Sequence, residues 1–479
     1  MNFYSRRIMV RSSQQHSGDS KSGQNKVRIR FGLKALLVMM TIIGTGFGVH
    51  AWFASKVQTK RTLREKLIEV DAYYTLAHQS EENLRDESSG DGDKIAGITE
   101  DEAEYTQPGP EFLRRIYGQD AFFEFTHVEL NSKWCSDELL ESALQQPKLT
   151  SLSIAGCKLN EVHLKHLASS SLEDVDLELT EPEETLAALS NVKTLKSLYV
   201  SCNELSLKSI DAIGKMPSLE KLTVSPAKNI SSEVLSRIGT CERLNWLWLD
   251  FADCQRDAFQ ISSIAELKHL EHLRIIGGAI VFDVPDVAFA KQLKSLWLTR
   301  VAFPNPTPGR LAPFESLEEL LSTNCGFGGI GNRDFPTIGK LKKLEVLNLI
   351  APIDGENLNE LKGLSELRVL SILHGCSTYF AKDIEFIAFL NKLERVSINP
   401  CGAKVNDLNF LYHPKSLRDI FVGGNVDPLV TQSLAHQPWW PSRISLHHFR
   451  RSGSWIDLNT TDFGGLPKWS SYSNKQNVK

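Results

Sequence analysis

The sequence predicts an α/β solenoid, in which stacked repeats place a parallel β-sheet on a concave face and short helices on a convex face, preceded by one transmembrane helix. The phrase Leu-x-x-Leu-x-Leu, or a close variant of it, recurs fourteen times along the chain. Successive phrases begin about 24 residues apart, which is typical of a repeat solenoid. An uncharged stretch of 19 residues near the N-terminus predicts the membrane helix.

Composition and charge exclude several classes of protein. The 479 residues are 41% hydrophobic and 23% charged, unlike a disordered, collagen-like or polytopic membrane chain. Lys and Arg number 54 and Asp and Glu 58, so the net charge of −4 argues against a nucleic-acid partner. Eight cysteines are too few for a disulfide scaffold. We expect them to pack as thiols and not to form bridges.

Residues 1–34 form a basic tail, and residues 35–53 form the predicted membrane span. As a helix these 19 residues would be about 28 Å long, close to the thickness of a bilayer core. The alternative is a cleaved signal peptide, which the long preceding tail and the bulky Trp52 and Phe53 disfavour. Basic residues flank the span five against five, and Arg6, Arg7 and Arg11 tip the balance towards a cytoplasmic N-terminus. The repeats are therefore expected outside the cytoplasm of a single-pass membrane protein.

The segment after the span predicts a juxtamembrane helix over residues 54–78, because apolar residues recur there at spacings of four and three. They are Leu63, Leu67, Val70, Tyr74 and Ala77. Residues 79–107 are rich in Asp and Glu and predict a solvated acidic linker.

Residues 108–449 carry the repeats, about fourteen in all. The phrases begin at Phe125, Leu149, Leu172, Leu195, Leu219, Leu244, Leu270, Leu293, Leu317, Leu344, Leu367, Leu393, Leu417 and Pro441. Each phrase predicts one short strand, since its later apolar residues alternate with residues that face outward. Segments between the strands, such as 159–168, 207–216, 231–239 and 382–393, have helical spacing and predict the convex side. Residues 450–479 are expected to cap the last repeat and then become disordered.

Eight residues after the start of several phrases stands a cysteine or an asparagine. These residues are Cys157, Asn203, Cys325, Cys401 and Asn425. They predict a ladder of small or hydrogen-bonding side chains behind the strands. The three cysteines are interpreted as core residues, not as redox or metal residues.

The phrases resemble the leucine-rich-repeat superfamily, and the basic tail with one anchor is similar to its bacterial single-span members. The resemblance covers residues 108–449 and departs from the family pattern at the Pro- and Gly-rich insertions 304–313 and 326–332. It implies the solenoid fold and an interaction with other proteins. It identifies neither a ligand nor a reaction.

The third, fifth and seventh places of each phrase should point outward and form columns along the concave sheet. In five neighbouring repeats these places hold large aromatic residues and one arginine: Tyr199, Trp246, Trp248, Arg274 and Trp297. Such residues are typical of interface hot spots, so they are the predicted partner-binding residues. The alternative is that the tryptophans only pack under neighbouring side chains.

Other candidate sites are weaker. Asp174, Asp176 and Glu178 share one strand face and are interpreted as a solvated acidic edge, with a cation site as the alternative. The glycines of 326–331 match a dinucleotide motif by letter, but inside a repeat array they predict a loop. His163 and His166 are three apart on an expected convex helix and are interpreted as solvated, with a metal site completed by ligands from elsewhere as the alternative. We predict no catalytic residues, no metal and no cofactor.

The predicted function is that of a membrane-anchored, non-enzymatic protein that presents a concave surface to a protein or peptide ligand, with weak self-association possible. One alternative is a self-associating structural scaffold of the cell envelope. Another is a hydrolase or transferase with an unrecognised site, which repeat arrays disfavour because they form open surfaces and not closed, dry pockets.

Overall fold

The computed structural model describes residues 33–69, 74–76, 124–132, 135–226, 230–251, 258–281, 289–304, 308–325, 329–351, 353–373, 379–423, 430, 433 and 445–448. The chain divides into two compact units, Met1–Gln58 and Thr59–Lys479. The predicted acidic linker at 79–107, the C-terminal segment at 450–479 and residues 1–32 of the basic tail lie outside the described residues.

Helix α1 (Leu33–Glu69) runs without a break through the predicted membrane span. Within the part of the chain that the structure describes, no helix is both long and apolar enough to cross a membrane. Most side chains of the predicted span, those of residues 35–44 and 46–48, lie outside the described residues.

The predicted juxtamembrane helix ends earlier than expected. It stops at Glu69, and strand β1 (Tyr74–Leu76) pairs antiparallel with strand β2 (Phe125–Asn131). The aromatic residues of this segment favour a strand, and the strand covers the edge of β2 that would otherwise remain open. Up to Glu69 the segment is helical, and Leu63 and Leu67 of its apolar face are fully buried in the core.

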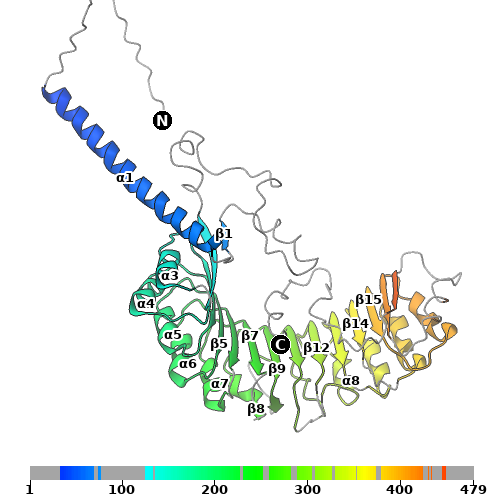
Figure 1. Cartoon of the computed structure of the whole chain (residues 1–479). Helices are drawn as coiled ribbons and strands as arrows, with labels where there is room; N and C mark the ends of the chain where they lie inside the picture. Colours follow the sequence, from blue (N-terminus) through cyan, green and yellow to red (C-terminus); the bar gives the residue numbers. More distant parts are fainter. Residues whose placement is uncertain are drawn as a thin grey trace, which may run out of the picture. The chain divides into compact units, whose positions relative to one another are not determined.

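The fourteen predicted phrases each contain a strand, and these strands lie in chain order in one sheet whose pairs are all parallel after β1–β2 (Figure 1). After β2 they are β3 (Ser151–Ala155), β4 (Asp174–Glu178), β5 (Ser197–Cys202), β6 (Lys221–Pro226), β7 (Trp246–Phe251), β9 (His272–Gly277), β11 (Ser295–Thr299), β12 (Glu319–Thr323), β13 (Val346–Ile350), β14 (Val369–Ile372), β15 (Arg395–Ile398), β16 (Asp419–Val422) and β17 (Ser445–His448). Strands β8 (Ala258–Gln260) and β10 (Ala279–Val281) form a separate parallel pair.

Buried and partly exposed side chains alternate along the strands, and this alternation explains where the core lies. In β3, for example, Leu152 and Ile154 are 1% exposed, whereas Ser151 and Ser153 between and beside them are partly exposed. Burying one such aliphatic side chain stabilises the fold by about 1.5–3 kcal/mol. Buried residues from Leu63 to Val422 belong to one continuous hydrophobic cluster, so the repeats share a single core.

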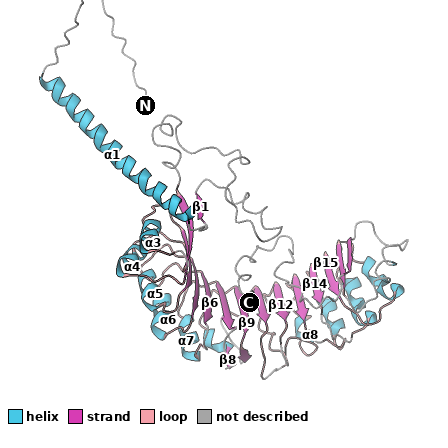
Figure 2. Cartoon of the chain, in the orientation of Figure 1, coloured by secondary structure: helices cyan, strands magenta, loops and turns pink. Residues whose placement is uncertain are grey.

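Helices cover one face of the sheet (Figure 2). The first repeats use α-helices: α3 (Asp137–Leu144), α4 (Glu161–Ala168), α5 (Glu183–Leu189), α6 (Leu207–Gly214) and α7 (Ser232–Ile238). Later repeats use the short α8 (Phe335–Ile338) and the 3₁₀-helices η3 (Ile261–Ile264), η4 (Leu358–Gly363), η5 (Ala381–Phe389) and η6 (Val405–Tyr412). The helical prediction is confirmed as α-helix at 159–168, 207–216 and 231–239, and as 3₁₀-helix at 382–393.

Local sequence explains both kinds of helix. Ser136, Asn160 and Ser206 cap α3, α4 and α6, each accepting a hydrogen bond from a backbone N–H of the first turn. In η4 the buried residues Leu358 and Leu361 are three apart, which matches a helix of 3.0 residues per turn.

The Pro- and Gly-rich insertions at 304–313 and 326–332 do not interrupt the sheet, because β11, β12 and β13 pair without a register shift. Arg310, whose side chain is 2% exposed, donates a hydrogen bond to Asp334 Oδ2 at 2.9 Å. Its guanidinium lies 4.3 Å from the centroid of the Phe303 ring. A buried ion pair therefore joins two consecutive repeats where the convex side is made mostly of turns.

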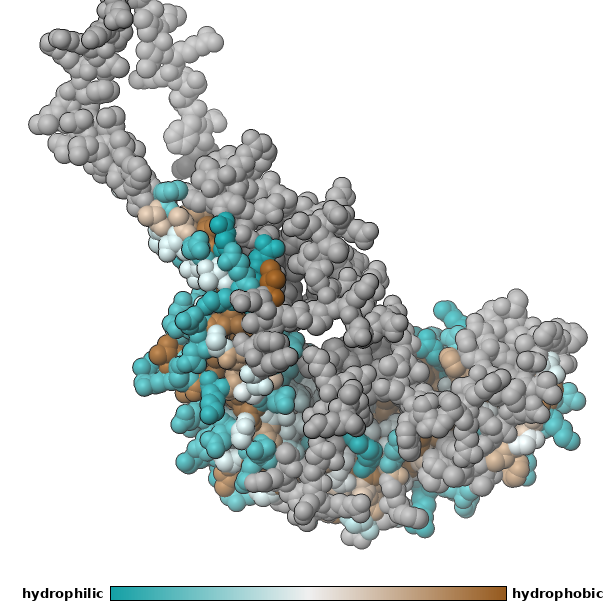
Figure 3. All heavy atoms as spheres, in the orientation of Figure 1, coloured by the Kyte–Doolittle hydropathy of each residue, from teal (hydrophilic) through white to brown (hydrophobic). Residues whose placement is uncertain are grey.

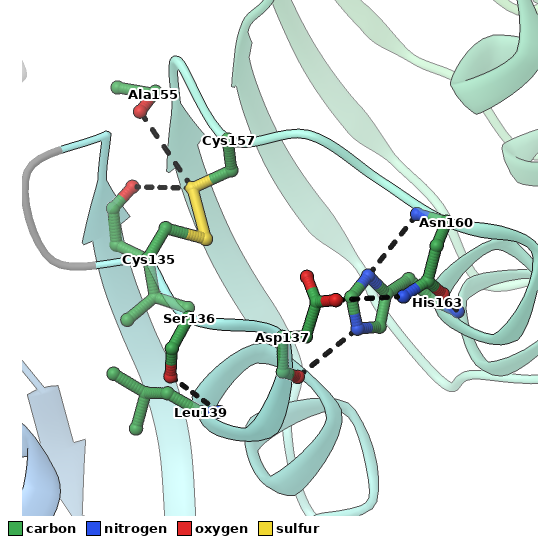
Figure 4. The surroundings of a disulfide bond; sticks show 9 residues. Cys135, Ser136, Asp137, Leu139, Ala155, Cys157, Asn160 and His163 are labelled. Atoms are coloured by element: carbon green, nitrogen blue, oxygen red, sulfur yellow. Dashed lines mark hydrogen bonds between the residues drawn. A yellow bond between two sulfur atoms is a disulfide. The ribbon is translucent and has the colours of Figure 1, made fainter.

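The expectation that the cysteines pack without bridging is wrong for one pair. Cys135 and Cys157 form a disulfide with a Cα–Cα distance of 5.8 Å (Figure 4). Cys157 follows β3 and Cys135 precedes α3, so one repeat period brings them together. The ladder interpretation fits Cys325 better, since its buried thiol lies 3.6 Å from the carbonyl oxygen of Leu298 in the preceding repeat.

His163 is not solvated, contrary to expectation. It is 1% exposed, and its Nε2 lies 3.1 Å from the carbonyl oxygen of Asp137 in the preceding repeat (Figure 4). The backbone N–H of Asn160 donates to its Nδ1 at 3.3 Å. His163 therefore fixes α4 to α3 next to the disulfide, while His166 lies 3.9 Å from Glu141 and is partly exposed.

Candidate functional site

Strand register brings the outward-facing residues of successive repeats into columns. The fifth places of the phrases form what we call the middle column, in which each residue is the register partner of the next. Its members are Glu129, Ser153, Asp176, Tyr199, Thr223, Trp248, Arg274, Trp297, Leu321, Asn348, Ser371, Ser397 and Phe421. The third places form a parallel first column, which includes Trp246, His272, Ser295 and Glu319.

Three of the five predicted binding residues form one stack. The guanidinium carbon of Arg274 lies 4.0 Å from the ring centroid of Trp248 and 5.2 Å from that of Trp297. Each such cation–π contact contributes about 0.5–2 kcal/mol. Trp248 is 9% exposed although it faces outward, so the stack is firmly packed. The alternative interpretation, that the tryptophans pack under neighbouring side chains, therefore holds for Trp248, which is largely covered.

Arg274 carries its positive charge in a largely buried position. Burial lowers its pKa to about 10, and the negative charge of Asp250 opposes this shift. Arg274 remains protonated at neutral pH, so the stack holds a positive charge between two aromatic rings.

The other two predicted residues lie apart from the stack. Trp246, 9% exposed, packs against His272, with ring centroids 4.8 Å apart. Tyr199 is separated from Trp248 by Thr223, which occupies the intervening strand. The structure therefore joins Trp248, Arg274 and Trp297, places Trp246 in the adjacent column, and leaves Tyr199 nearer to the acidic residues.

An acidic cluster occupies the first strands. Asp174, Asp176 and Glu178 lie on β4, and Glu129 lies on β2, with β3 between the two strands. Burial together with the charges of Asp174, Glu129 and Glu178 raises the pKa of Asp176 to about 7. Ser153 opposes the shift through a side-chain hydrogen bond. Asp176 is thus partly buried and not the fully solvated acid that was expected. Among the residues that the structure describes, no group of three His, Cys, Asp or Glu is arranged to hold a metal ion.

Replacing Asp176 with asparagine is expected to flatten the pH dependence of stability between about pH 4 and pH 7. The pKa of Asp176 is higher in the folded chain than its ordinary value of 3.8, so its contribution to stability is present at low pH and is lost as the pH rises through about 7. Asparagine is neutral throughout this range. Thermal midpoints measured from pH 4 to pH 8 should fall less steeply for D176N than for the wild type.

The matched control is D211N, because Asp211 is about half exposed and pairs with Arg237 on the convex helices. If the thermal midpoints of the wild type and D176N changed with pH in the same way, the raised pKa of Asp176 would be contradicted.

Several residues of the site were missed from sequence. Glu319 accepts hydrogen bonds from Trp297 Nε1 at 3.3 Å and from Ser295 Oγ at 2.9 Å. Asn348 and Ser371 are each 1% exposed in the middle column, and the Asn348 amide and the Ser371 hydroxyl have no hydrogen-bond partner in the described part of the chain. Aligning the third and fifth places over all phrases would have placed them in these columns. Their burial could not have been predicted from the phrase.

The period of about 24 residues, one parallel strand per repeat and short helices on the opposite face decide the fold. It is a leucine-rich-repeat solenoid. No protein-family model matches the chain, and no curated protein matches it either.

Three solved structures illustrate what the solenoid is similar to. An internalin of Listeria monocytogenes is 20% identical over 62% of this chain and 86% of its own, with a TM-score of 0.44. A leucine-rich-repeat protein of Leptospira interrogans is 15% identical over 71% and 92%, with a TM-score of 0.45. The plant peptide hormone receptor RGFR1 in complex with RGF2 is 14% identical over 61% and 55%, with a TM-score of 0.33.

Proposed function

We propose that this chain is a membrane-anchored, non-enzymatic leucine-rich-repeat protein that presents the concave face of its sheet to a protein or peptide partner outside the cytoplasm. The observation that carries the proposal is the stack of Trp248, Arg274 and Trp297 in the middle column. Aromatic and arginine side chains held on a rigid sheet bury large contact areas at little further cost in conformational entropy.

Two features support a membrane anchor at the N-terminal side and a repeat array outside the cytoplasm. Residues 35–53 carry no formal charge, and α1 is helical throughout them. The Cys135–Cys157 disulfide suits an oxidising compartment, because thiols in the cytoplasm are kept reduced. An N-terminus in the cytoplasm and a repeat array outside it satisfy both features.

The triple variant W246A/W248A/W297A is expected to lose most partner capture. Truncating a central aromatic hot spot costs about 2 kcal/mol or more of binding free energy, which is a loss of about 30-fold for each such residue. The measurement is crosslinked pull-down and proximity labelling from intact cells, which reports the partner and the membrane side together.

The matched control removes exposed apolar side chains from the convex helices, where the surface is mainly hydrophilic with scattered hydrophobic residues (Figure 3). Val162 on α4 is 46% exposed and Leu207 on α6 is 36% exposed, so V162A/L207A should capture partners as the wild type does. Undiminished capture by a folded triple variant would refute the concave binding surface.

A further inference from the structure

Two neighbouring side chains of the middle column have hydrogen-bond donors that lack an acceptor. Trp248 Nε1 and Arg274 Nε are buried, and neither has a partner in the described part of the chain. The two residues are register partners on β7 and β9. A buried donor without an acceptor costs about 1–3 kcal/mol, so two adjacent ones indicate that an acceptor is supplied from outside.

The next tryptophan along the column shows which kind of acceptor this face accommodates. Trp297 Nε1 donates to the carboxylate of Glu319 at 3.3 Å, and the same oxygen accepts from Ser295 Oγ at 2.9 Å. The array thus supplies a carboxylate to one indole of the stack. The described residues supply none to the other indole, that of Trp248.

The geometry of Arg274 restricts the acceptor further. The rings of Trp248 and Trp297, on the strands at either side of β9, both lie against its guanidinium, and a guanidinium stacked on aromatic rings forms hydrogen bonds through its edge. Arg274 is positively charged, whereas an indole N–H is neutral. A carboxylate has two oxygens and a negative charge, so it can satisfy both donors at once.

The column also indicates the size of the ligand. Partly exposed residues continue on both sides of the pair, with Tyr199 and Thr223 before it and Trp297 and Leu321 after it. Five strand steps separate Tyr199 from Leu321, which is about 24 Å. An extended chain of about seven residues covers this length, whereas a free carboxylic acid would cover one step. A chain that continues in both directions carries its carboxylate on a side chain.

We propose that Trp248 and Arg274 form a subsite for the side-chain carboxylate of an internal Asp or Glu in an extended segment of the partner. The subsite rests on the proposed binding function and names the chemistry that the concave face selects. Trp248 Nε1 donates to one carboxylate oxygen and the edge of Arg274 donates to the other.

The test uses the full chain, reconstituted in lipid nanodiscs, and a display library of eleven-residue peptides that are acetylated at the N-terminus and amidated at the C-terminus. The central residue is fixed as Glu in one pool and as Gln in a second. Charged hydrogen bonds contribute about 1.5–3 kcal/mol, so Glu-centred peptides should be enriched about 10- to 100-fold over Gln-centred ones.

Variants of each donor residue test whether the preference for Glu over Gln depends on Trp248 and Arg274. R274Q removes the charge, and W248F removes the N–H while it keeps an aromatic ring beside Arg274. Each should abolish the preference for Glu, so that Glu-centred and Gln-centred peptides are enriched equally, whatever the variant does to overall peptide binding. The control is R395Q, because Arg395 also lies on the concave face but already donates to Asp419 Oδ2 at 3.3 Å. It should keep the preference, and thermal midpoints should show that all variants are folded.

Four outcomes would overturn the subsite. The first two are equal enrichment of the two pools and an unchanged preference in R274Q. The third is a higher enrichment of a third pool that has a free C-terminal carboxylate and no central acid, and the fourth is the absence of any enriched peptide. Partner capture by the triple tryptophan variant in cells decides separately whether the proposed function survives.

Discussion

Replacing Arg310 with alanine should cost about 3–5 kcal/mol of unfolding free energy, because it leaves the Asp334 carboxylate buried without its ionic partner. The side chains of the pair are 2% and 4% exposed, so water cannot solvate the remaining charge. The cavity left beside Phe303 adds to the loss. Urea unfolding followed by circular dichroism measures the free energy, and hydrogen exchange in β11, β12 and β13 shows where stability is lost.

A double-mutant cycle separates the buried charge from the lost packing. In R310M/D334N both charges are gone, and the asparagine oxygen can still accept the hydrogen bond that Gly331 N donates to Asp334 at 3.2 Å. This double variant should be more stable than R310M alone. The exposed pair of Arg237 and Asp211 is the reference, since R237A should cost less than about 1 kcal/mol. A cost for R310A as small as that of R237A would refute the interpretation.

The repeat phrase predicted most of the fold. In the twelve phrases that begin with Leu the strand begins two residues after that Leu, as β3 does after Leu149, because inward and outward places alternate with period two. The Arg310–Asp334 pair could not be predicted in the same way. Arg310 lies in the insertion 304–313 and Asp334 lies two residues after the insertion 326–332, so both are outside the phrase, and only the close approach of neighbouring repeats brings them together.

The sequence predicted which residues form the candidate site but not the contacts between their side chains. The outward-facing positions of the phrases identified Trp248, Arg274 and Trp297, because the two-residue period of a strand alone determines which positions face outward. The stacking of the three side chains depends on their rotamers, and Glu319 bonds to Trp297 across a strand pair, which no single phrase contains. Tyr199 shows the limit of the prediction, because sequence proximity placed it with the stack and register places it beside Asp176.

Removing the disulfide with C135S/C157S should lower the stability of the first repeats by about 3 kcal/mol, the loop entropy for cysteines 22 residues apart. Because each repeat contacts only its neighbours, the loss should be concentrated in β2, α3 and β3. Hydrogen exchange should therefore accelerate there and remain unchanged in β13 to β16. C401S, which alters a partly buried cysteine that forms no disulfide, is the control.

The same pair of cysteines tests the location of the array. If the repeats lie outside the cytoplasm, alkylation of freshly lysed cells should leave Cys135 and Cys157 unmodified, and both should react after reduction. Mass spectrometry of the alkylated peptides measures this directly. Immediate alkylation of both cysteines would place the array in a reducing compartment and contradict the proposed topology. It would leave the concave binding surface intact, because the Trp248–Arg274–Trp297 stack lies several repeats away from the disulfide.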